Sequence, residues 1–369
     1  MTAISHVPGG TIVLRMARLT WFRHRWAVAT ILAVFGAATL VLLAEGIALR
    51  AWLDGAGLAH CLPGSGSFGL ACRDSPALAQ LLGGDNGQAA FFAGDTAHLL
   101  LAVPPVAALF AGLPWVTREF ETGSFRYTWV QGINPVRWLL GTYGSLTAIA
   151  AAGAVVCGLV FDWWYRTAQW TVNVTPSMGW DWDAFGLSPI ALVGWTVFAM
   201  ALAMLAGAAI RRTVPAMAAF AVCYAACLAF AEWWLRQRLL TIMPVVRQVS
   251  FDAIQNRGDY GVNGWMTGPD GHVLTAGQQL NAYLAASHAK GMTEGQWLTA
   301  HHYADWIAYQ PHDRLVIFQL AVTLALLVLA ALSVLTAVRL LSRDRGVRGR
   351  AGATRRRLRL RRSAPAGRS

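Results

Sequence analysis

The sequence predicts an all-α integral membrane protein with six transmembrane helices, with both termini in the cytoplasm and a helical extracellular cap between the fifth and sixth helices. Hydrophobic residues make up 56% of the chain and charged residues only 13%, against about 25% charged in ordinary soluble domains. A helix needs about 20 mostly apolar residues to cross a bilayer. Six runs qualify or nearly qualify: residues 27–49, 97–116, 139–161, 187–210, 214–235 and 315–338.

The arginines predict which side of the membrane each connecting segment faces, because Lys and Arg in short loops are retained in the cytoplasm. Residues 1–26, 117–138, 211–212 and 339–369 together hold 21 of the 30 basic residues but only 3 of the 18 acidic ones. These four segments are therefore expected on the cytoplasmic side. The membrane body would then run from residue 27 to residue 338.

The leader, residues 1–26, is expected to contain a helix that lies along the membrane surface. Apolar residues such as Ile12, Met16 and Leu19 fall roughly on one helical face and the arginines of the leader fall on another. A simple basic flank that only fixes topology is the alternative. No cleavable signal peptide is expected, because the first apolar run is longer than a usual signal core.

The fourth and fifth runs are separated only by Arg211, Arg212 and Thr213, which predicts a tight helical hairpin. Pro215 fits the first turn of the second helix of this hairpin. The tail, residues 339–369, is predicted to be a basic disordered segment that lies on anionic lipid. It contains no aromatic residue for base stacking, so nucleic acid is not the expected partner.

Two external regions are expected, residues 50–96 and residues 236–314. The second is too long for an unstructured connection in a compact protein. Thr293 and Gln296 resemble a capping box, and apolar residues follow at helical spacing, which predicts a small helical cap. The residues placed on this helical face are Trp297, Ala300, Ala304 and Ile307.

The polar segment between the second and third runs, residues 117–138, is longer than a plain connector needs to be. It contains a helix stop at Gly123, a new helix cap at Ser124 and a turn before the next run near Pro135. The carboxylates Glu119 and Glu121 stand near arginines of the same segment. This arrangement predicts a docking surface, with a solvated loop that only satisfies topology as the alternative.

This segment resembles the cytoplasmic segment that joins the second and third spans of type 2 permeases of ATP-binding-cassette (ABC) exporters. In that family it has a charged start, a Gly followed by Ser or Thr, and a later Pro near an Arg. The chain also resembles a subgroup of this family from high-GC bacteria. The similar positions are Trp129, Gln131 and Trp138, together with residues 19–26 and 309–319. The resemblance implies ATPase docking on this coupling segment, through Arg118, Glu119, Glu121, Gly123, Ser124, Arg126, Pro135 and Arg137.

The resemblance implies a multi-pass permease subunit of an exporter in a bacterial cell membrane. Its expected partners are a cytoplasmic ABC ATPase subunit and a second permease copy, identical or similar. A phosphate-cradling loop of the form GxxxxGK[ST] needs a lysine, and the only lysine, Lys290, is expected on the outer side. The chain is therefore not expected to be an enzyme or to bind a cofactor, and ATP and Mg would be bound by the partner ATPase.

In the related fold the translocation path lies between two protomers and is lined by the second and fifth spans. The pathway residues implied here are Leu101, Pro105, Leu109, Tyr224, Cys227 and Phe230.

Other reactive groups leave several alternatives open. Cys61 and Cys72 share the first external region and would form a disulfide in an oxidising exterior, or remain free. Carboxylates near the outer ends of the spans, such as Glu45 and Asp162, either attract cationic cargo or simply meet water at the interface. No metal site is expected, and no HExxH, GxSxG or CxxC motif occurs. A non-transporting sensor or scaffold with a ligand-binding external cap is the alternative function.

Overall fold

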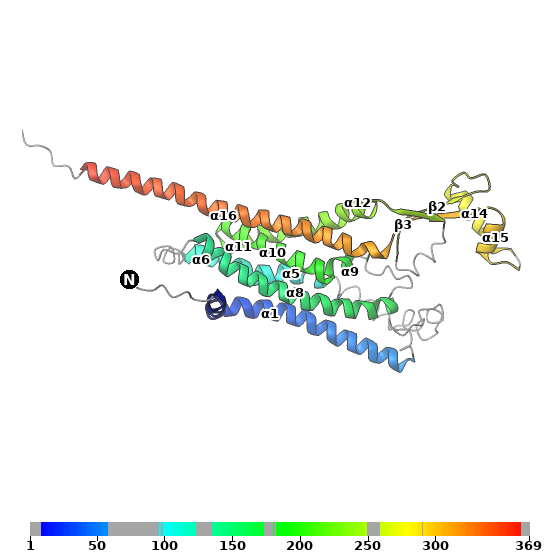
Figure 1. The fold of residues 1–369 in the computed structure, drawn as a ribbon, viewed down its shortest axis with the longest axis horizontal. Helices are drawn as coiled ribbons and strands as arrows, with labels where there is room; N and C mark the ends of the chain where they lie inside the picture. Colours follow the sequence, from blue (N-terminus) through cyan, green and yellow to red (C-terminus); the bar gives the residue numbers. More distant parts are fainter. Residues whose placement is uncertain are drawn as a thin grey trace, which may run out of the picture.

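The computed structural model describes residues 9–57, 96, 99–122, 135–172, 180, 182–248, 259–289 and 291–362; for some of them, including residues 9–24, 135–138 and 343–362, only the backbone is described. Long helices lie side by side along the longest axis of the molecule, and a small mixed unit of strands and short helices stands at one end (Figure 1). This architecture agrees with a mostly helical membrane protein.

Five stretches within the described residues are long and apolar enough to cross a membrane: Arg25–Gly55, Leu139–Arg166, Pro189–Ile210, Thr213–Leu240 and His312–Ser342. They lie in α1 (Gly9–Gly55), α8 (Pro135–Val172), α10 (Pro189–Ile210), the continuous run of α11 (Thr213–Phe230), η3 (Ala231–Leu235) and α12 (Arg236–Leu240), and α16 (Leu315–Arg362). These stretches confirm a multi-pass membrane protein. The count of six stays a prediction.

The predicted second span is built from three short pieces. They are α5 (Val103–Ala107), the π-helix η2 (Ala108–Gly112) and α6 (Leu113–Thr122). Pro104 and Pro105 stand in the first turn of α5, where a missing N–H leaves no helical bond unmade. A turn at residues 101–102 precedes α5, so the predicted run is interrupted near its start.

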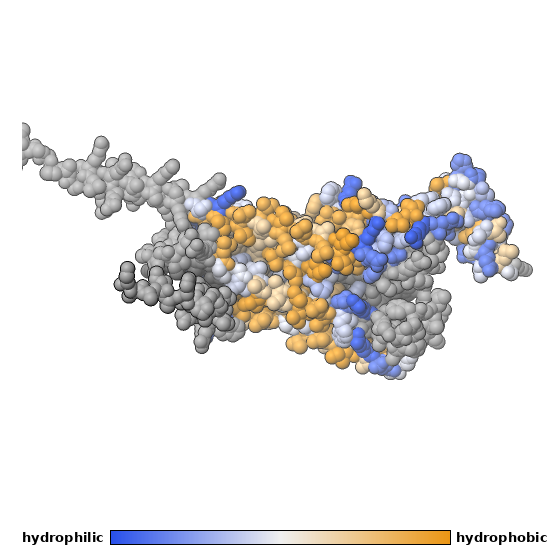
Figure 2. Space-filling model, in the orientation of Figure 1, coloured by the Kyte–Doolittle hydropathy of each residue, from blue (hydrophilic) through white to orange (hydrophobic). Residues whose placement is uncertain are grey.

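Helix α10 is the centre of the helical body. It packs against α8, α11, α16 and α6, and 67% of its apolar window is buried. Its polar groups are satisfied locally; for example, the buried Thr196 hydroxyl donates to the Leu192 carbonyl. Figure 2 shows an apolar band over the helical body, with more hydrophilic residues toward the sheet. The band is the surface that a bilayer would cover.

The arginine-bearing stretches gather at one end of the molecule. The start of α1, the end of α6, the start of α8 and the end of α16 all lie on the side opposite the strands, and α16 extends well beyond the other three (Figure 1). This end is called the Arg-rich end below, and the other is called the sheet end. The segregation agrees with the expected sidedness, whereas the assignment of the Arg-rich end to the cytoplasm stays a prediction.

The sheet end corrects the predicted helical cap. Strands β1 (Val245–Gln248), β2 (Tyr260–Thr267) and β3 (Ala304–Gln310) form an antiparallel sheet in the order β1-β3-β2, accompanied by α14 (Ala276–Ser287) and α15 (Glu294–Ala300). Residues 245–310 are called the sheet unit below.

The predicted capping box at Thr293 and Gln296 is confirmed at the start of α15. The helical face predicted to continue through Ala304 and Ile307 is wrong, because both residues lie in β3. His302 adopts a left-handed backbone with φ of 62°, which ends the helical path before the strand begins.

Both ends of the chain differ in extent from the sequence prediction. The backbone of α16 is helical through Arg362, whereas the sequence predicted a disordered tail from residue 339. The Arg, Leu and Ala residues of this tail are good helix formers, and the first proline of the tail is Pro365, beyond the end of the helix. The leader is helical from Gly9, and Figure 1 shows its first turns nearly end-on, in a different direction from the rest of α1.

Candidate functional site

The described part of the coupling segment is the end of α6 and the start of α8. Arg118, Glu119 and Glu121 lie on the last turns of α6, and the helix reaches Thr122, next to the predicted stop at Gly123. Three predicted docking residues lie outside the described residues: Gly123, Ser124 and Arg126. The other two, Pro135 and Arg137, belong to the first turn of α8, where only the backbone is described.

The predicted hairpin between α10 and α11 is confirmed and lies against the end of α6. Arg211 adopts a left-handed conformation with φ of 56°, and its N–H donates to the Gly207 carbonyl, which closes α10. Arg212 is the N-cap of α11, has an extended backbone, and makes no side-chain capping bond. Pro215 lies in the first turn of α11, as predicted.

Glu121 joins α6 to the first residue of α11. Its Oε1 accepts from the backbone N–H of Thr213 at 2.8 Å and from the Thr213 hydroxyl at 3.1 Å. The hydroxyl oxygens of Thr117 and Thr213 lie 2.8 Å apart. These three residues, Thr117, Glu121 and Thr213, are called the α6–α11 clamp below.

Electrostatics favours this placement of the carboxylate. The first N–H groups of a helix have no partner within the helix and carry partial positive charge, so an anion there is stabilising. Glu121 itself is exposed, which lets solvent screen the attraction. Thr117 is completely buried, so the clamp extends from solvent into the packed body.

Close packing fixes α6 just below the clamp. A Cβ built at Gly207 of α10 would lie 3.0 Å from the Val116 Cβ, so a larger residue there would fit only if Val116 shifted by a few tenths of an ångström. The ring of Trp115 lies 5.9 Å from that of Tyr143 on α8, and the Tyr143 hydroxyl donates to the Met200 carbonyl on α10. The Arg-rich end is therefore a tightly joined group of four helices.

The predicted pathway residues differ in how far they are exposed at the surface of the protomer. Leu101, Pro105 and Leu109 are half-buried, at four-residue spacing before and along α5 and η2. On α11, Tyr224 is only 4% exposed and its ring lies 5.7 Å from Trp195 of α10. Tyr224 therefore faces the inside of the protomer.

The two remaining pathway residues lie closer to the sheet end. Cys227 is half-buried, and Phe230 is exposed and stacks on Trp234 at 5.1 Å.

Several other residues singled out in the sequence have local partners. The Thr96 hydroxyl donates to Glu45 Oε1 at 3.0 Å, and Asp162 pairs with Arg166 at 2.9 Å. These contacts favour interfacial carboxylates over a cargo-attracting ring. Cys61 and Cys72 lie outside the described residues. Among the residues that are described, no group of three or more His, Cys, Asp or Glu side chains is placed to hold a metal.

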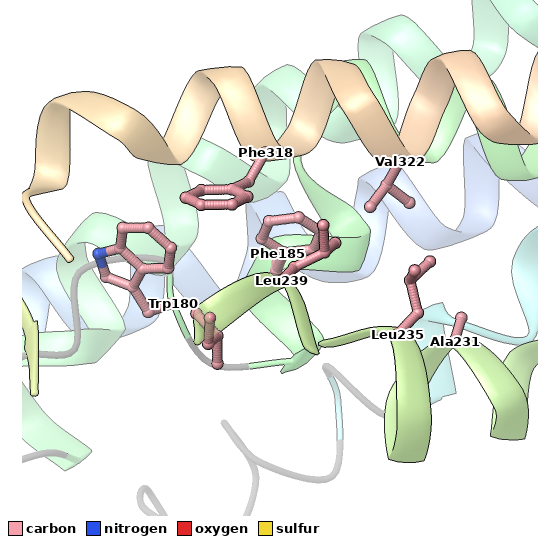
Figure 3. Close-up of a pocket in the computed structure, with 8 residues that line it drawn as sticks. Trp180, Phe185, Ala231, Leu235, Leu239, Phe318 and Val322 are labelled. Carbon is pink, nitrogen blue, oxygen red and sulfur yellow. The ribbon is translucent and has the colours of Figure 1, made fainter. Parts of the chain in front are cut away.

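An apolar pocket lies near the sheet end, between α9 (Trp182–Leu187), η3, α12 and the start of α16. The rings of Trp180 and Phe318 meet edge to face at 5.7 Å in this pocket (Figure 3). The lining residues are Trp180, Phe185, Ala231, Leu235, Leu239, Leu240, Phe318 and Val322. All are apolar apart from the Trp180 indole nitrogen, so the pocket suits hydrocarbon or simple packing.

Taken together, the apolar helices and the charged end of α6 define a multi-pass membrane protein with a polar, arginine-rich end. A sequence model of the family described as "ABC-2 membrane transporter related" matches residues 21–236, which is more than half of the chain. The chain belongs to this family, whose members are membrane subunits of ABC transporters and typically pair with an ATPase subunit. Neither curated proteins nor solved structures gave a match.

Sequence reasoning found the charged end of α6 but missed the two threonines of the clamp. The sequence pattern predicts Thr213 only as part of a short hairpin turn, and it assigns no role to Thr117. One local signal was available: the position before α11 is Arg212, which is a poor N-cap residue type. A helix start without a local cap can indicate that another segment supplies the cap.

Proposed function

We propose that this chain is the permease subunit of an ATP-driven exporter that works by alternating access with separate ATPase subunits. The observation that carries the proposal is the charged end of α6, which stands at the Arg-rich end and is bonded directly to α11. A soluble motor that binds there would act on the helical body without entering the bilayer.

The proposed topology has six spans and a cytoplasmic Arg-rich end. The described part of the second run before the charged end of α6 is residues 99–116. These 18 residues, at a rise of about 1.5 Å each, extend about 27 Å, which is close to the thickness of the hydrocarbon. This run would be the second span. The retention of arginines in the cytoplasm supports this orientation of the chain, in which the sheet unit would lie outside the cell.

The proposed energy source is ATP bound with Mg on the partner ATPase. Moving a two-state protein from 1:99 to 99:1 takes about 5.5 kcal/mol of differential binding, so the partner needs a firm attachment. The coupling segment is proposed as that attachment. Export, rather than import, is proposed from the family resemblance.

The functional unit is proposed to be a pair of permease copies, identical or similar, in a bacterial cell membrane. The path would lie between the copies, near α5, η2 and α11. The basic residues at the end of α16 are proposed to contact anionic lipid, where each charge near the surface contributes about 1 kcal/mol.

The proposal is tested by reversing charges on the coupling segment and measuring which ATPase co-purifies. The tagged chain, solubilised in detergent from its own host, should bring down a subunit with a GxxxxGK[ST] loop and vanadate-sensitive hydrolysis of MgATP. The double variant R118E/R126E should lose this subunit. The control R247E, a single reversal of the same kind on exposed β1, should keep it, and the single variant R118E, which matches it in charge, should weaken the association.

Two results would contradict the proposal. Either no nucleotide-hydrolysing subunit accompanies the wild-type chain, or R118E/R126E retains as much of it as R247E. Elution of all four proteins at the same volume on size exclusion would exclude unfolding as the cause of a loss.

The sensor or scaffold alternative is favoured by one observation on the sheet unit. Helix α14 exposes Leu280 at 59% and Leu284 at 48%, with Tyr283 beside them. Such a face suits a ligand or a protein partner. A chain that binds a partner through this face, without any associated ATPase, would fit the alternative.

A further inference from the structure

The α6–α11 clamp joins the proposed docking segment to a helix proposed to line the path. We propose that Glu121 is a positioning residue that fastens the end of α6 to the first turn of α11, so that the two move as one body. This inference rests on the proposed function and deepens it, because it assigns the route by which docking reaches the membrane helices.

Helix α11 depends on Glu121 because it has no cap of its own. Most helix starts are capped by a side chain at the preceding position, but Arg212 makes no such bond. The N–H of Thr213 is instead satisfied by a carboxylate from 92 residues earlier in the chain. An ordinary local cap would stabilise one helix, whereas this cap ties two helices together.

The direction of each hydrogen bond follows from the chemistry of the groups. An ionised carboxylate only accepts, so the Thr213 hydroxyl must donate to Glu121. That hydroxyl has one hydrogen, so Thr117 is the donor in its contact with Thr213. The Thr117 hydrogen is shared with the Leu113 and Pro114 carbonyls of its own helix, at 3.3 and 3.4 Å. The clamp runs from buried Thr117 through Thr213 to Glu121.

The surroundings leave little slack between the two helices. The left-handed Arg211 closes α10 directly before the clamp, and Gly207 holds α10 against Val116 of α6. A displacement of the end of α6 is therefore transmitted to Thr213 without a flexible segment between them. The sequence assigned Glu121 to ATPase docking, but its Oε1 is committed to α11.

The clamp is tested in the complex of this chain with its ATPase, using the native cysteine Cys227 as the reporter. The rate at which a small maleimide labels half-buried Cys227 is measured by mass spectrometry, with and without MgATP. In the wild-type complex MgATP should change this rate, because α11 moves. The ATPase that co-purifies and its hydrolysis rate are measured in parallel.

The variants separate positioning from docking. E121A should keep the ATPase bound but reduce the MgATP effect on Cys227 labelling at least about fivefold, the lower end of ordinary coupling between sites. E121Q, which keeps an acceptor oxygen for Thr213, should retain most of the effect. The control D162N, which removes a carboxylate from an exposed pair with Arg166, should match the wild type.

Two outcomes in the complex would overturn the inference. In the first, E121A loses the ATPase itself, which would make Glu121 a docking residue. In the second, E121A shows the full MgATP effect, which would leave the clamp without a role in coupling.

A measurement on the isolated chain keeps the test independent of transport. Spin labels are placed at T122C and R212C in a background with the native cysteines replaced by serine. The distance distribution should be narrow with Glu121 present and broader with E121A, and equal widths would overturn the clamp. If the distribution broadens as expected but MgATP has no effect on the wild-type complex, the proposed function fails while the clamp stands.

Discussion

Gly158 lets α8 pack directly against the backbone of α10, and this contact gives the sharpest stability prediction. A Cβ built at Gly158 would lie 2.6 Å from the Pro189 Cα and 3.1 Å from its nitrogen, whereas ordinary contacts fall at 3.4–4 Å. In G158A the two helices must separate, because backbone atoms cannot rotate away as the end of a side chain can.

The magnitude follows from two opposing terms. Overpacking against backbone should cost about 3 kcal/mol, the upper part of the usual range. Alanine is a better helix former than glycine by about 1 kcal/mol, which offsets part of this cost. The net loss in the free energy of unfolding should be about 2 kcal/mol, and the melting midpoint of a chain of this size should fall by about 3 °C.

The assay heats the detergent-solubilised protein and measures the fraction that still elutes as a monodisperse peak. The matched control is G144A on the same helix, where nothing lies within 4 Å of the added Cβ. G144A should melt at or above the wild-type temperature. If G158A melts as high as G144A, the close approach of α8 and α10 is refuted.

Three further changes test other parts of the structure. Y143F removes the buried hydroxyl that donates to the Met200 carbonyl and should lower the stability by about 1 kcal/mol in the same assay. T293A removes the capping box of α15 and should cost about 1 kcal/mol, seen as faster proteolysis of the sheet unit. Burial raises the pKa of Asp305 above 3.8, and a hydrogen bond from Tyr283 offsets only part of this shift. The folded state then binds the Asp305 proton more tightly than the unfolded state does. The contribution of Asp305 to the free energy of unfolding therefore falls as pH rises from 3.8 through the pKa of Asp305 in the folded protein. D305N should remove this fall, which hydrogen exchange of the sheet unit at matched pH would show.

The helical body was predictable because its signal lies within each segment. A bilayer requires long apolar runs, and five of the six predicted runs contain a helix of suitable length and hydropathy. The hairpin at residues 211–213 was predictable for a similar local reason, since three residues leave no room for any other connection. The turn and π-helix of the second run gave no comparable signal.

The sheet was not predictable from local pattern, because its strands are distant in sequence. Val245 pairs with Tyr309, and Tyr260 pairs with Gln310. Strand β2 contains Gly261 and Gly264 and a register shift near Asn263, which resemble a loop when the sequence is read alone. Its strand character comes from β3, which lies more than 35 residues later in the chain.

The position of Glu121 at a functional end of α6 was predictable, whereas its contact with α11 was not. Carboxylates beside arginines indicated a functional end of α6, but the sequence cannot show that residues 92 positions apart are in contact. The absence of a capping residue at Arg212 indicates that α11 needs a partner without indicating which one.

The π-helical turn η2 makes the clamp tolerant of the loss of one residue in this turn. A π-helical turn holds one residue more than an α-helical turn, and each residue of an α-helix rotates the following side chains by about 100°. Deleting one residue within Ala108–Gly112 would convert η2 to ordinary helix and leave Thr117 and Glu121 facing α11, whereas the same deletion in the α-helical part of α6 before Thr117 would turn both residues away by about 100°. The loss of a single codon would therefore do less harm in η2 than a few residues later in the chain.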